Sequence, residues 1–436
     1  MKIIYLSINY LRLAHPSFPT HFRSALDLKS RDLFGLLLLT CFQGGLAFAQ
    51  SFPEFKHHDI NPDAGTGLAI TVADVDSDGD TDIVGVSSDD VAWYENPSWE
   101  RHLIADTIKN SNVCIAGNDV DGDGTIEFAL GADWQFANTN TGGALYLLRA
   151  QGDVKQPWQV IELVSQEPTL HRIRWADTDG DGKKELVVAP LKGIGTKEPN
   201  FQERGVRLYS LRPGTDPFKT PWREDIIDDS LHVLHNVWPI STGANGKDAV
   251  LAASFEGITR FNYHAGQWSK TLLAAGNPAP LPNSGAGEIK SSASTPMMLA
   301  TIEPWHGNQA VVYAQRGPGQ NDWERHVVDD SLAGGHAVWW SDFDGDNADE
   351  LMAGWREKSP ASGKPGLAIY DFAEKPDGSP NGARWVKHIV DDGGMATEDA
   401  LAADINGDGK PDIVAFGRAT HNIKYYENLG TGETKK

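Results

Sequence analysis

Short alternating runs of apolar and polar residues, each broken by Gly, Asp or Asn, follow one another from about residue 52 to residue 429. One kind of run recurs seven times and begins with an aromatic residue. The seven copies start at Phe55, Trp99, Trp158, Trp222, Trp268, Trp323 and Trp385, 44 to 64 residues apart. Alternation with a period of two is typical of half-buried strands, and no helical period is present, so the pattern predicts an all-β chain built from repeats.

Each period holds four predicted strands, which is the content of one propeller blade. The chain opens with the aromatic strand at Phe55 and closes with a strand around Tyr425, so the first strand can complete the last blade and remove exposed sheet edges. No linker rich in Pro, Ser or charge divides the units evenly, which argues against a string of β-sandwiches. The sequence therefore predicts a seven-bladed β-propeller over residues 50–436, with four antiparallel strands per blade.

The first 49 residues differ from the rest. Lys29 and Arg31 precede an apolar run, Leu33–Leu39, and a small-residue site follows at Ala47–Ala49. This order predicts a secretory signal peptide, preceded by an over-called start, and hence an extracellular or periplasmic protein without stable membrane insertion. The alternatives are a buried helix or a membrane anchor. The mature chain keeps a single cysteine, so it can form no internal disulfide.

Five loops carry oxygen-bearing side chains at positions 1, 3, 5 and 9 and a Gly or Asn at position 6. Their residues are Asp74, Asp76, Asp78 and Asp82; Asp119, Asp121, Asp123 and Glu127; Asp177, Asp179, Asp181 and Glu185; Asp342, Asp344, Asp346 and Glu350; and Asp404, Asn406, Asp408 and Asp412. Oxygen ligands at this spacing wrap around one hard cation. Position 12 lacks the Glu of an EF-hand, and a strand follows at once. The sequence predicts about five structural Ca²⁺ sites in β-hairpin loops.

The alternative for a single loop is a solvated acidic turn, but five loops in register with the blades favour calcium. Two blades lack the pattern: Ser241–Lys247 keeps the turn without carboxylates, and no metal loop is found near Ser291–Thr295. Five Ca²⁺ ions would offset ten of the 22 excess negative charges. Because the sequence shows no basic stripe, nucleic acid is not expected as a partner.

This combination resembles the FG-GAP (VCBS) repeat family of β-propellers, over about residues 52–429. The resemblance implies that the calcium loops join the first and second strands of a blade on one face. It also implies that binding sites lie on the opposite face, where the loops between blades and the loops after the second strand gather.

Counting back six residues from each acidic loop, and from the corresponding turn of the two blades that lack one, with Glu288 assigned by alignment of its degenerate blade, predicts one position beside the propeller axis in every blade. These residues are Leu68, Val113, His171, His235, Glu288, His336 and Glu398. A structural repeat would favour one apolar residue type there, as Leu68 and Val113 show. Five polar replacements at a partly desolvated axis therefore indicate a functional site.

Loops on the same face are expected to add further groups. Those after the second strands are Lys192, Glu256, Glu303, His306, Arg356, Arg418 and His421, and those between blades are Arg172, Asn236 and Asp399. Arg174 lies two residues after Arg172 and is expected to face the same way. Trp134, Trp305, Trp339, Trp340 and Trp355 are candidates either for stacking on sugar rings or for core packing.

Histidines, carboxylates and arginines together support two kinds of chemistry. Histidine with Glu is a plausible ligand set for a divalent transition metal. Histidine near Arg suits β-elimination from a uronic acid, because Arg neutralises the sugar carboxylate and a neutral His removes the acidified proton. A single histidine of this kind is more often a satisfied hydrogen-bonding residue, but the set of five favours a site.

Several segments resemble one subgroup, the propeller domain of fungal aldos-2-ulose dehydratase and the related L-rhamnosyl-glucuronate lyases. They are Leu170–Trp175, Leu231–Asn236, Glu303–Gln309, Gly335–Trp340 and Thr397–Gly409. The resemblance implies a metal-containing lyase that acts on sugars, with His171, Arg172, His235, Glu288, His306 and His336 in its site. Because the sequence lacks the cupin domains of the dehydratase, we expect elimination from a uronate-terminated glycan, such as a rhamnosyl-glucuronate end.

The sequence thus predicts a secreted carbohydrate lyase. His171 or His235 is expected to act as the base, and His306 or a Tyr as the acid. The expected carboxylate and substrate contacts are Arg172, Arg174, Asn236, Arg356 and Arg418, and the expected ligands of a further axial metal are His235, Glu288, His336 and Glu398. The alternative is a non-catalytic propeller that binds glycan or protein on this face, and a hydrolase is a weaker third hypothesis. The sequence leaves the oligomeric state open.

Overall fold

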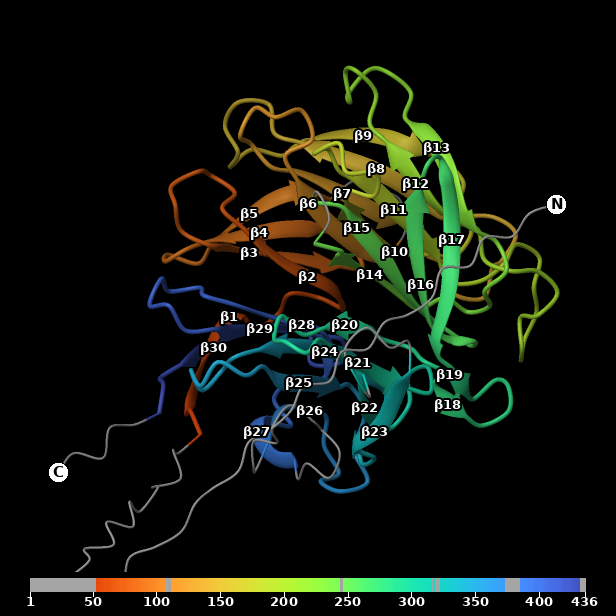
Figure 1. Ribbon diagram of the computed structural model, residues 1–436. Helices are drawn as coiled ribbons and strands as arrows, with labels where there is room; N and C mark the ends of the chain where they lie inside the picture. The colour runs from red at the N-terminus through yellow and green to blue at the C-terminus, as the bar shows by residue number, and fades with distance from the viewer. Residues whose placement is uncertain are drawn as a thin grey trace, which may run out of the picture. The chain divides into compact units, whose positions relative to one another are not determined.

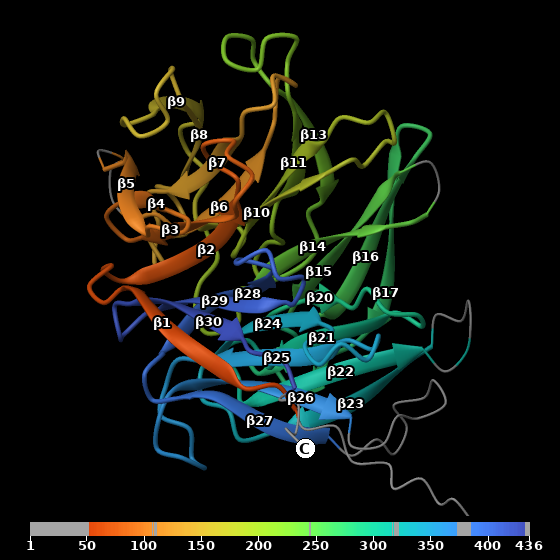
Figure 2. The same cartoon turned by 90° about the vertical axis from the view of Figure 1, so that its left-hand side faces the viewer.

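Seven four-stranded antiparallel sheets make up a computed structural model of the chain, which describes residues 52–106, 108, 111–243, 246–315, 317, 322–372 and 385–431. The predicted signal peptide lies outside the described residues. The sheets are the blades of a β-propeller, so the predicted fold class is confirmed (Figures 1 and 2). We name the strands of a blade A to D, from the innermost to the outermost, and number the blades 1 to 7 in chain order.

The strand bounds follow the predicted repeats. The A strands are β2 (Gly67–Ala73), β6 (Cys114–Asn118), β10 (Leu170–Ala176), β14 (Asn236–Ser241), β20 (Lys290–Ser291), β24 (Gly335–Ser341) and β28 (Thr397–Ala403). The B strands are β3 (Asp82–Ser87), β7 (Glu127–Ala132), β11 (Glu185–Pro190), β15 (Asp248–Ser254), β21 (Met298–Glu303), β25 (Glu350–Trp355) and β29 (Asp412–Gly417). The C strands are β4 (Val91–Glu95), β8 (Ala144–Arg149), β12 (Leu208–Arg212), β16 (Gly257–His264), β22 (Gln309–Gln315), β26 (Gly366–Phe372) and β30 (Ile423–Asn428).

The D strands are the aromatic runs found in the sequence. They are β5 (Glu100–Ala105), β9 (Gln159–Val164), β13 (Arg223–Asp228), β17 (Gln267–Ala274), β23 (Trp323–Asp329), β27 (Trp385–Asp392) and β1 (Phe55–Asn61). A two-stranded pair, β18 (Asn277–Pro278) and β19 (Ser284–Gly285), lies in the connection from blade 4 to blade 5.

The first strand of the fold closes the ring. β1 pairs with β30, with Phe55 opposite Asn428 and His57 opposite Tyr426, and the two lie side by side in both views (Figures 1 and 2). Blade 7 is therefore built from both ends of the described chain. This confirms the closure predicted from the phase of the repeats, which leaves no blade with an incomplete sheet.

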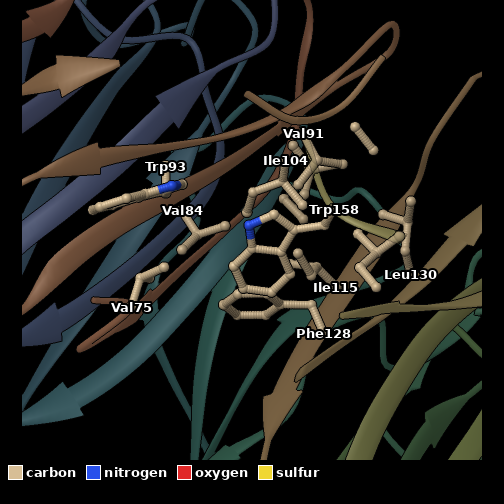
Figure 3. Packing of buried hydrophobic residues seen from close by; sticks show 13 residues of the cluster. Val75, Val84, Val91, Trp93, Ile104, Ile115, Phe128, Leu130 and Trp158 are labelled. Carbon is tan, nitrogen blue, oxygen red and sulfur yellow. The ribbon is translucent and has the colours of Figure 1, made fainter. Parts of the chain in front are cut away.

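The core lies between neighbouring blades. Where blade 1 meets blade 2, Trp158 packs against Phe128, with ring centroids 5.6 Å apart, and Val84 and Ile104 lie on the facing sheet (Figure 3). All four side chains are buried. Because the aromatic residue at or beside the start of each D strand packs against the core between two sheets, its repetition at every blade has a packing cause.

Cys114 is a buried free thiol. In the part of the chain that the structure describes, no helix has the length and apolar character needed to span a membrane.

Candidate active site

The five acidic loops connect strands A and B of blades 1, 2, 3, 6 and 7, and they share one hydrogen-bond pattern. In the first loop, the carboxylate of Asp74 accepts the backbone N–H groups of Asp78 and Gly79, both at 3.1 Å. The buried carboxylate of Asp82 accepts the N–H group of Val75 at 2.9 Å. The same two arrangements recur in the other four loops. Backbone donors therefore hold the first and ninth positions of each loop in place.

The loop carboxylates crowd together in a way that suits a bound cation. Oxygen atoms of Asp342, Asp344, Asp346 and Glu350 all lie within 4.8 Å of one another. Burial, with a contribution from neighbouring carboxylates, raises the pKa of Glu350 to about 9. In the first loop, Asp76 Oδ1 is buried and accepts no hydrogen bond from the described residues. A hard divalent cation would satisfy such oxygens and remove the repulsion among them, so these residues fit calcium.

Two of the five loops also contain an arginine from the neighbouring C strand. Arg149 lies 3.3 Å from Asp121, and Arg212 lies 3.0 Å from both Asp181 and Glu185. These guanidinium groups already neutralise part of the loop charge. A cation bound in these two loops would therefore share the carboxylates with an arginine.

The two blades without acidic loops use single carboxylates instead. Asp248 of blade 4 accepts the N–H group of Asp177 at 3.0 Å, which ties its A–B hairpin to the third loop. Asp349 of blade 6 accepts the N–H groups of Ala293 and Ser294 in the hairpin of blade 5, at 2.7 and 2.9 Å. Hydrogen bonds between blades thus replace the calcium-loop pattern at these hairpins.

At the other end of the A strands, three histidines repeat one contact around the axis. His171 Nδ1 lies 2.9 Å from the carbonyl oxygen of His235, His235 Nδ1 lies 3.1 Å from that of Gly287, and His336 Nδ1 lies 2.5 Å from that of Glu398. A carbonyl only accepts, so each Nδ1 carries the proton and donates to the next blade. Each Nε2 therefore presents a lone pair.

His306 holds the opposite tautomer. It comes from the loop after β21, with φ at +52°, and its Nε2 lies 2.9 Å from Nε2 of His235. Arg356 Nη2 donates to His306 Nδ1 at 3.1 Å, so the proton of His306 is on Nε2 and is donated to His235. His306 is thus the one of the four neighbouring histidines whose proton lies on Nε2, and its unusual backbone angle places it beside His235.

All four histidines are held in the neutral form. Burial, reinforced by the charges of Arg172 and Arg356 nearby, lowers the pKa of His171, His306 and His336 well below the ordinary value. Burial also lowers the pKa of His235, against the opposing effect of Glu288. Neutral imidazoles can accept a proton, so the site has the protonation state that a general base requires.

The arginines and glutamates around the histidines form two groups. Glu398 accepts from Arg356 Nη1 at 2.8 Å and from Arg418 Nη1 at 2.7 Å. Glu288 accepts a hydrogen bond from Asn236 Nδ2, and its Oε1 lies 3.7 Å from Arg172. Burial opposes ionisation of Glu288, but His235, Arg172 and Lys290 outweigh it and lower the pKa of Glu288 to about 2. Three arginines face two carboxylates, so the site favours an anionic ligand.

A cavity of about 230 Å³ opens above these groups, and we call it the histidine chamber. Its lining comprises Leu68, Val113, Trp134, Phe136, His171, Arg172, Leu191, Trp305, His306, His336, Arg356, Glu398 and Arg418. Trp134, Phe136 and Trp305 form one wall, with ring centroids 6.3 and 6.1 Å apart in succession. Aromatic faces of this kind stack on sugar rings.

A second cavity of about 270 Å³ lies further along the A strands, and we call it the lysine chamber. Arg172 lines both chambers, whereas Arg174, Lys290, Trp238 and Trp339 line only the lysine chamber. Arg174 faces the same way as Arg172, as expected, and both line the lysine chamber. Two residues along a strand advance about 6.6 Å, so Arg174 does not line the histidine chamber.

Other predicted site residues lie elsewhere. Glu303 is buried against Tyr313 and Arg325, and Glu256 binds His232. Trp340 and Trp355 are buried in the cluster between blades 5 and 6. Sequence reasoning missed Phe136, which no periodic pattern marks, and Lys290. The position of Lys290 two residues after Glu288 was a signal that it faces the axis.

The axial residues fit a metal only in part. Ring nitrogens of His235, His306 and His336 lie within 4.8 Å of one another. His235 and His336 donate Nδ1–H to carbonyls, as metal-ligating histidines do, but the proton of His306 lies on the nitrogen that would have to bind. The expected ligands Glu288 and Glu398 are instead engaged by Asn236, Arg172, Arg356 and Arg418. We therefore derive no reaction step through an axial metal.

The fold and this site define a β-propeller with a histidine- and arginine-lined cavity on its axis. Residues 142–316 match the family model described as the β-propeller domain of aldos-2-ulose dehydratase. The matched segment runs from the end of blade 2 into blade 5 and contains His171, Arg172, His235, Glu288 and His306. It links the chain to a domain of a carbohydrate-processing enzyme.

The similarity to solved structures supports only the fold of this chain. The crystal structures of BBS1N in complex with ARL6DN, one soaked with lead and one with mercury, each align with a TM-score of 0.52. Their identities are 11% and 10%, and the alignments cover 88% of this chain and 99% and 98% of those chains. No curated protein sequence matches the chain.

Proposed function

We propose that this protein is a secreted carbohydrate lyase that eliminates across a uronate residue in the histidine chamber. The observation that carries the proposal is a neutral histidine, His336, which lines a cavity together with Arg356 and Arg418 and accepts no hydrogen bond at Nε2 from the described residues, the carboxylate of Glu398 lying 3.7 Å from that atom. The match to a propeller domain of a sugar dehydratase supports the same substrate class. A uronate-containing glycan, such as one with rhamnosyl-glucuronate ends, is the proposed substrate.

The arginines would bind and activate the sugar carboxylate. Arg418 lines the chamber with 43% of its side chain exposed, and only its Nη1 is used by Glu398. Charge neutralisation of the carboxylate acidifies the proton on the adjacent ring carbon. Planar guanidinium groups suit this role because they bind carboxylates through two N–H groups at once.

His336 is the proposed base. Of the neutral histidines, His171 accepts from Arg172 Nη1 at 3.2 Å and His235 accepts from His306, so their lone pairs are already used. His336 Nε2 takes the ring proton, the C–H electrons form the new double bond, and the bond from the neighbouring carbon to the glycosidic oxygen breaks. This assignment differs from the sequence hypothesis, which placed the base at His171 or His235.

His306 is the proposed acid, because its proton lies on Nε2 and Arg356 holds its other nitrogen as an acceptor. Donation of this proton to the departing oxygen breaks the hydrogen bond to His235 and leaves His306 one proton short. The proton that His336 took from the sugar then passes to His306, which restores both neutral imidazoles, and no water is consumed. Trp134, Phe136 and Trp305 would stack on the sugar rings and keep the reacting bond between the two histidines.

We further propose that the five acidic loops bind Ca²⁺ and stabilise the blades. The shared hydrogen-bond pattern and the crowding of carboxylates support this role. The loops lie at the far end of the A strands from the histidine chamber. Calcium is therefore proposed to act on stability and to take no part in the reaction.

The test follows the ultraviolet absorbance of the conjugated double bond that uronate elimination creates. Purified protein would be incubated with a panel of uronate-capped glycans, gum arabic among them. A rise in absorbance that is absent with His336→Ala is expected. A flat trace across the panel, with glycan binding retained, would instead favour the non-catalytic binding propeller.

A further inference from the structure

The lysine chamber contains a buried cation that makes no hydrogen bond or ion pair with the described residues. Lys290 is only 6% exposed. Its Nζ lies 4.3 Å from the ring centre of Trp238 and 5.5 Å from that of Trp339. Aromatic faces compensate a buried ammonium group only in part, because its three N–H donors still lack acceptors. Burial, with help from Arg174, lowers the pKa of Lys290 to about 8.

Arg174 adds a second cation to the same cavity. Its Nη1 donates to the carbonyl oxygen of Ile173 at 2.8 Å, and its guanidinium carbon lies 5.7 Å from the ring centre of Trp238. Both contacts are neutral ones. Burial lowers the pKa of Arg174, which reflects the cost of keeping this charge away from water.

In the part of the chain that the structure describes, one carboxylate lines the chamber, and it is already held by the backbone. Asp399 accepts the N–H group of Ile70 at 3.1 Å through Oδ2 and that of Ala400 at 3.1 Å through Oδ1. Arg172 also lines the chamber, and it lies 3.7 Å from Glu288 Oε1 of the neighbouring site. Cations therefore outnumber carboxylates in the chamber, and the excess charge points at a cavity of about 270 Å³.

We propose that the lysine chamber binds a small tetrahedral oxyanion, of the size and charge of sulfate or phosphate. Arg172 and Arg174 approach from β10 and Lys290 approaches from β20, so the donors reach the cavity from different blades. An anion with acceptors in several directions can bind all of them, whereas a planar carboxylate presents two. The proposal is independent of the lyase proposal, because the lysine chamber lies beyond Arg172 and contains none of the four histidines.

The test measures sulfate and phosphate binding to the full mature chain by calorimetry at constant ionic strength. We expect saturable binding of one ion. Lys290→Met should weaken it by about tenfold or more, because a hydrogen-bonded charge of this kind contributes about 1.5–3 kcal/mol. Asp399→Asn should strengthen binding, because it removes the negative charge of the one carboxylate that lines the chamber among the described residues. Acetate should bind at least about tenfold more weakly than sulfate.

Lys192 provides a matched control. It is also a buried lysine, and burial lowers its pKa to about 8, but its Nζ donates to the carbonyl oxygen of Phe136 at 2.8 Å, outside the lysine chamber. Lys192→Met should leave sulfate binding unchanged. In anion-free buffer Lys290→Met should raise the melting temperature, since it removes an unpaired buried charge, and Lys192→Met should lower it.

Crystals of the unaltered protein soaked in selenate provide a measurement that needs no variant. An anomalous peak within hydrogen-bonding distance of Lys290 Nζ is expected. Absence of saturable binding, equal binding by Lys290→Met, or an empty chamber at saturating selenate would overturn the proposal. Equal binding of acetate would overturn the assignment to a tetrahedral ion.

Discussion

The acidic loops and the histidine chamber lie at opposite ends of the same A strands. The residues of the loops repeat from blade to blade, whereas those of the chamber differ. The loops repeat: Asp74 and Asp404 occupy the same position and accept the same backbone N–H groups. The chamber does not repeat, because each blade contributes a different residue at one axial position. A residue pattern that recurs in every blade serves the folding of each blade. Residues that differ from blade to blade at one position form a single site in the assembled ring. The loops should therefore govern stability, and the chamber should govern chemistry.

Removal of calcium should have the largest effect. Each site would contribute about 2.7 kcal/mol at a calcium concentration one hundred times its Kd, so loss of five sites should lower the melting temperature strongly. Scanning calorimetry with and without chelator measures this, and restored calcium is the control. An unchanged melting curve in chelator would show that the acidic loops are solvated turns.

His336→Ala should have the next largest effect, mainly on activity. Loss of the proposed base should lower kcat/KM by about 10²- to 10⁴-fold, whereas loss of its buried hydrogen bond to the carbonyl oxygen of Glu398 should lower the melting temperature only modestly. His388→Ala is the matched control, because His388 lies on the outermost strand of blade 6, stacked on Phe52. Equal activity of the two variants would remove His336 from the mechanism.

The axial site shows what sequence can specify. His171, His235, His336 and Glu398 could be assigned to the axis because the repeats fix the register of every A strand. The role of Glu398 could not be predicted from the sequence, because it depends on Arg356 and Arg418, which come from two other loops. Pairing of that kind is decided by tertiary contacts that no spacing in the sequence encodes.

The fold was more predictable than the site. Aromatic runs, acidic loops and the phase of the first strand each indicate a closed seven-bladed ring, and all three are local patterns. Arg174 shows the limit of such patterns: alternation gives its direction, but its depth along the axis places it beside Lys290 in a different chamber. Phe136 lies in an irregular loop, and no repeating sequence pattern predicts where its side chain lies.

Arg418→Gln should weaken substrate binding more than catalysis. Loss of a charged hydrogen bond to the carboxylate should raise KM about tenfold, and Arg418→Lys should recover only part of it because lysine cannot bind through two N–H groups. Arg101→Gln is the control, since Arg101 is similarly exposed but pairs with Asp90 on blade 1. An unchanged KM for both Arg418 variants would place the carboxylate elsewhere.

Arg212→Gln should have the smallest effect. It tests whether an acidic loop that contains an arginine binds calcium more weakly because of that arginine. Removal of a cation that shares Asp181 and Glu185 with the proposed calcium ion should increase calcium affinity there by about twofold to tenfold. Calcium titration followed by calorimetry can resolve it. Arg207→Gln is the control, because Arg207 pairs with Glu167 outside the loops. Lower calcium affinity in Arg212→Gln would mean that the arginine supports the site.

The mass of the uronate-bearing product tests the central claim most directly. Elimination consumes no water, so that fragment should be lighter by one water molecule than the product of hydrolysis of the same bond. Elimination in the histidine chamber predicts the lighter product from the unaltered protein and from His388→Ala, and none from His336→Ala. A hydrolytic product, or a lighter product that persists in His336→Ala, would contradict elimination by the histidine chamber.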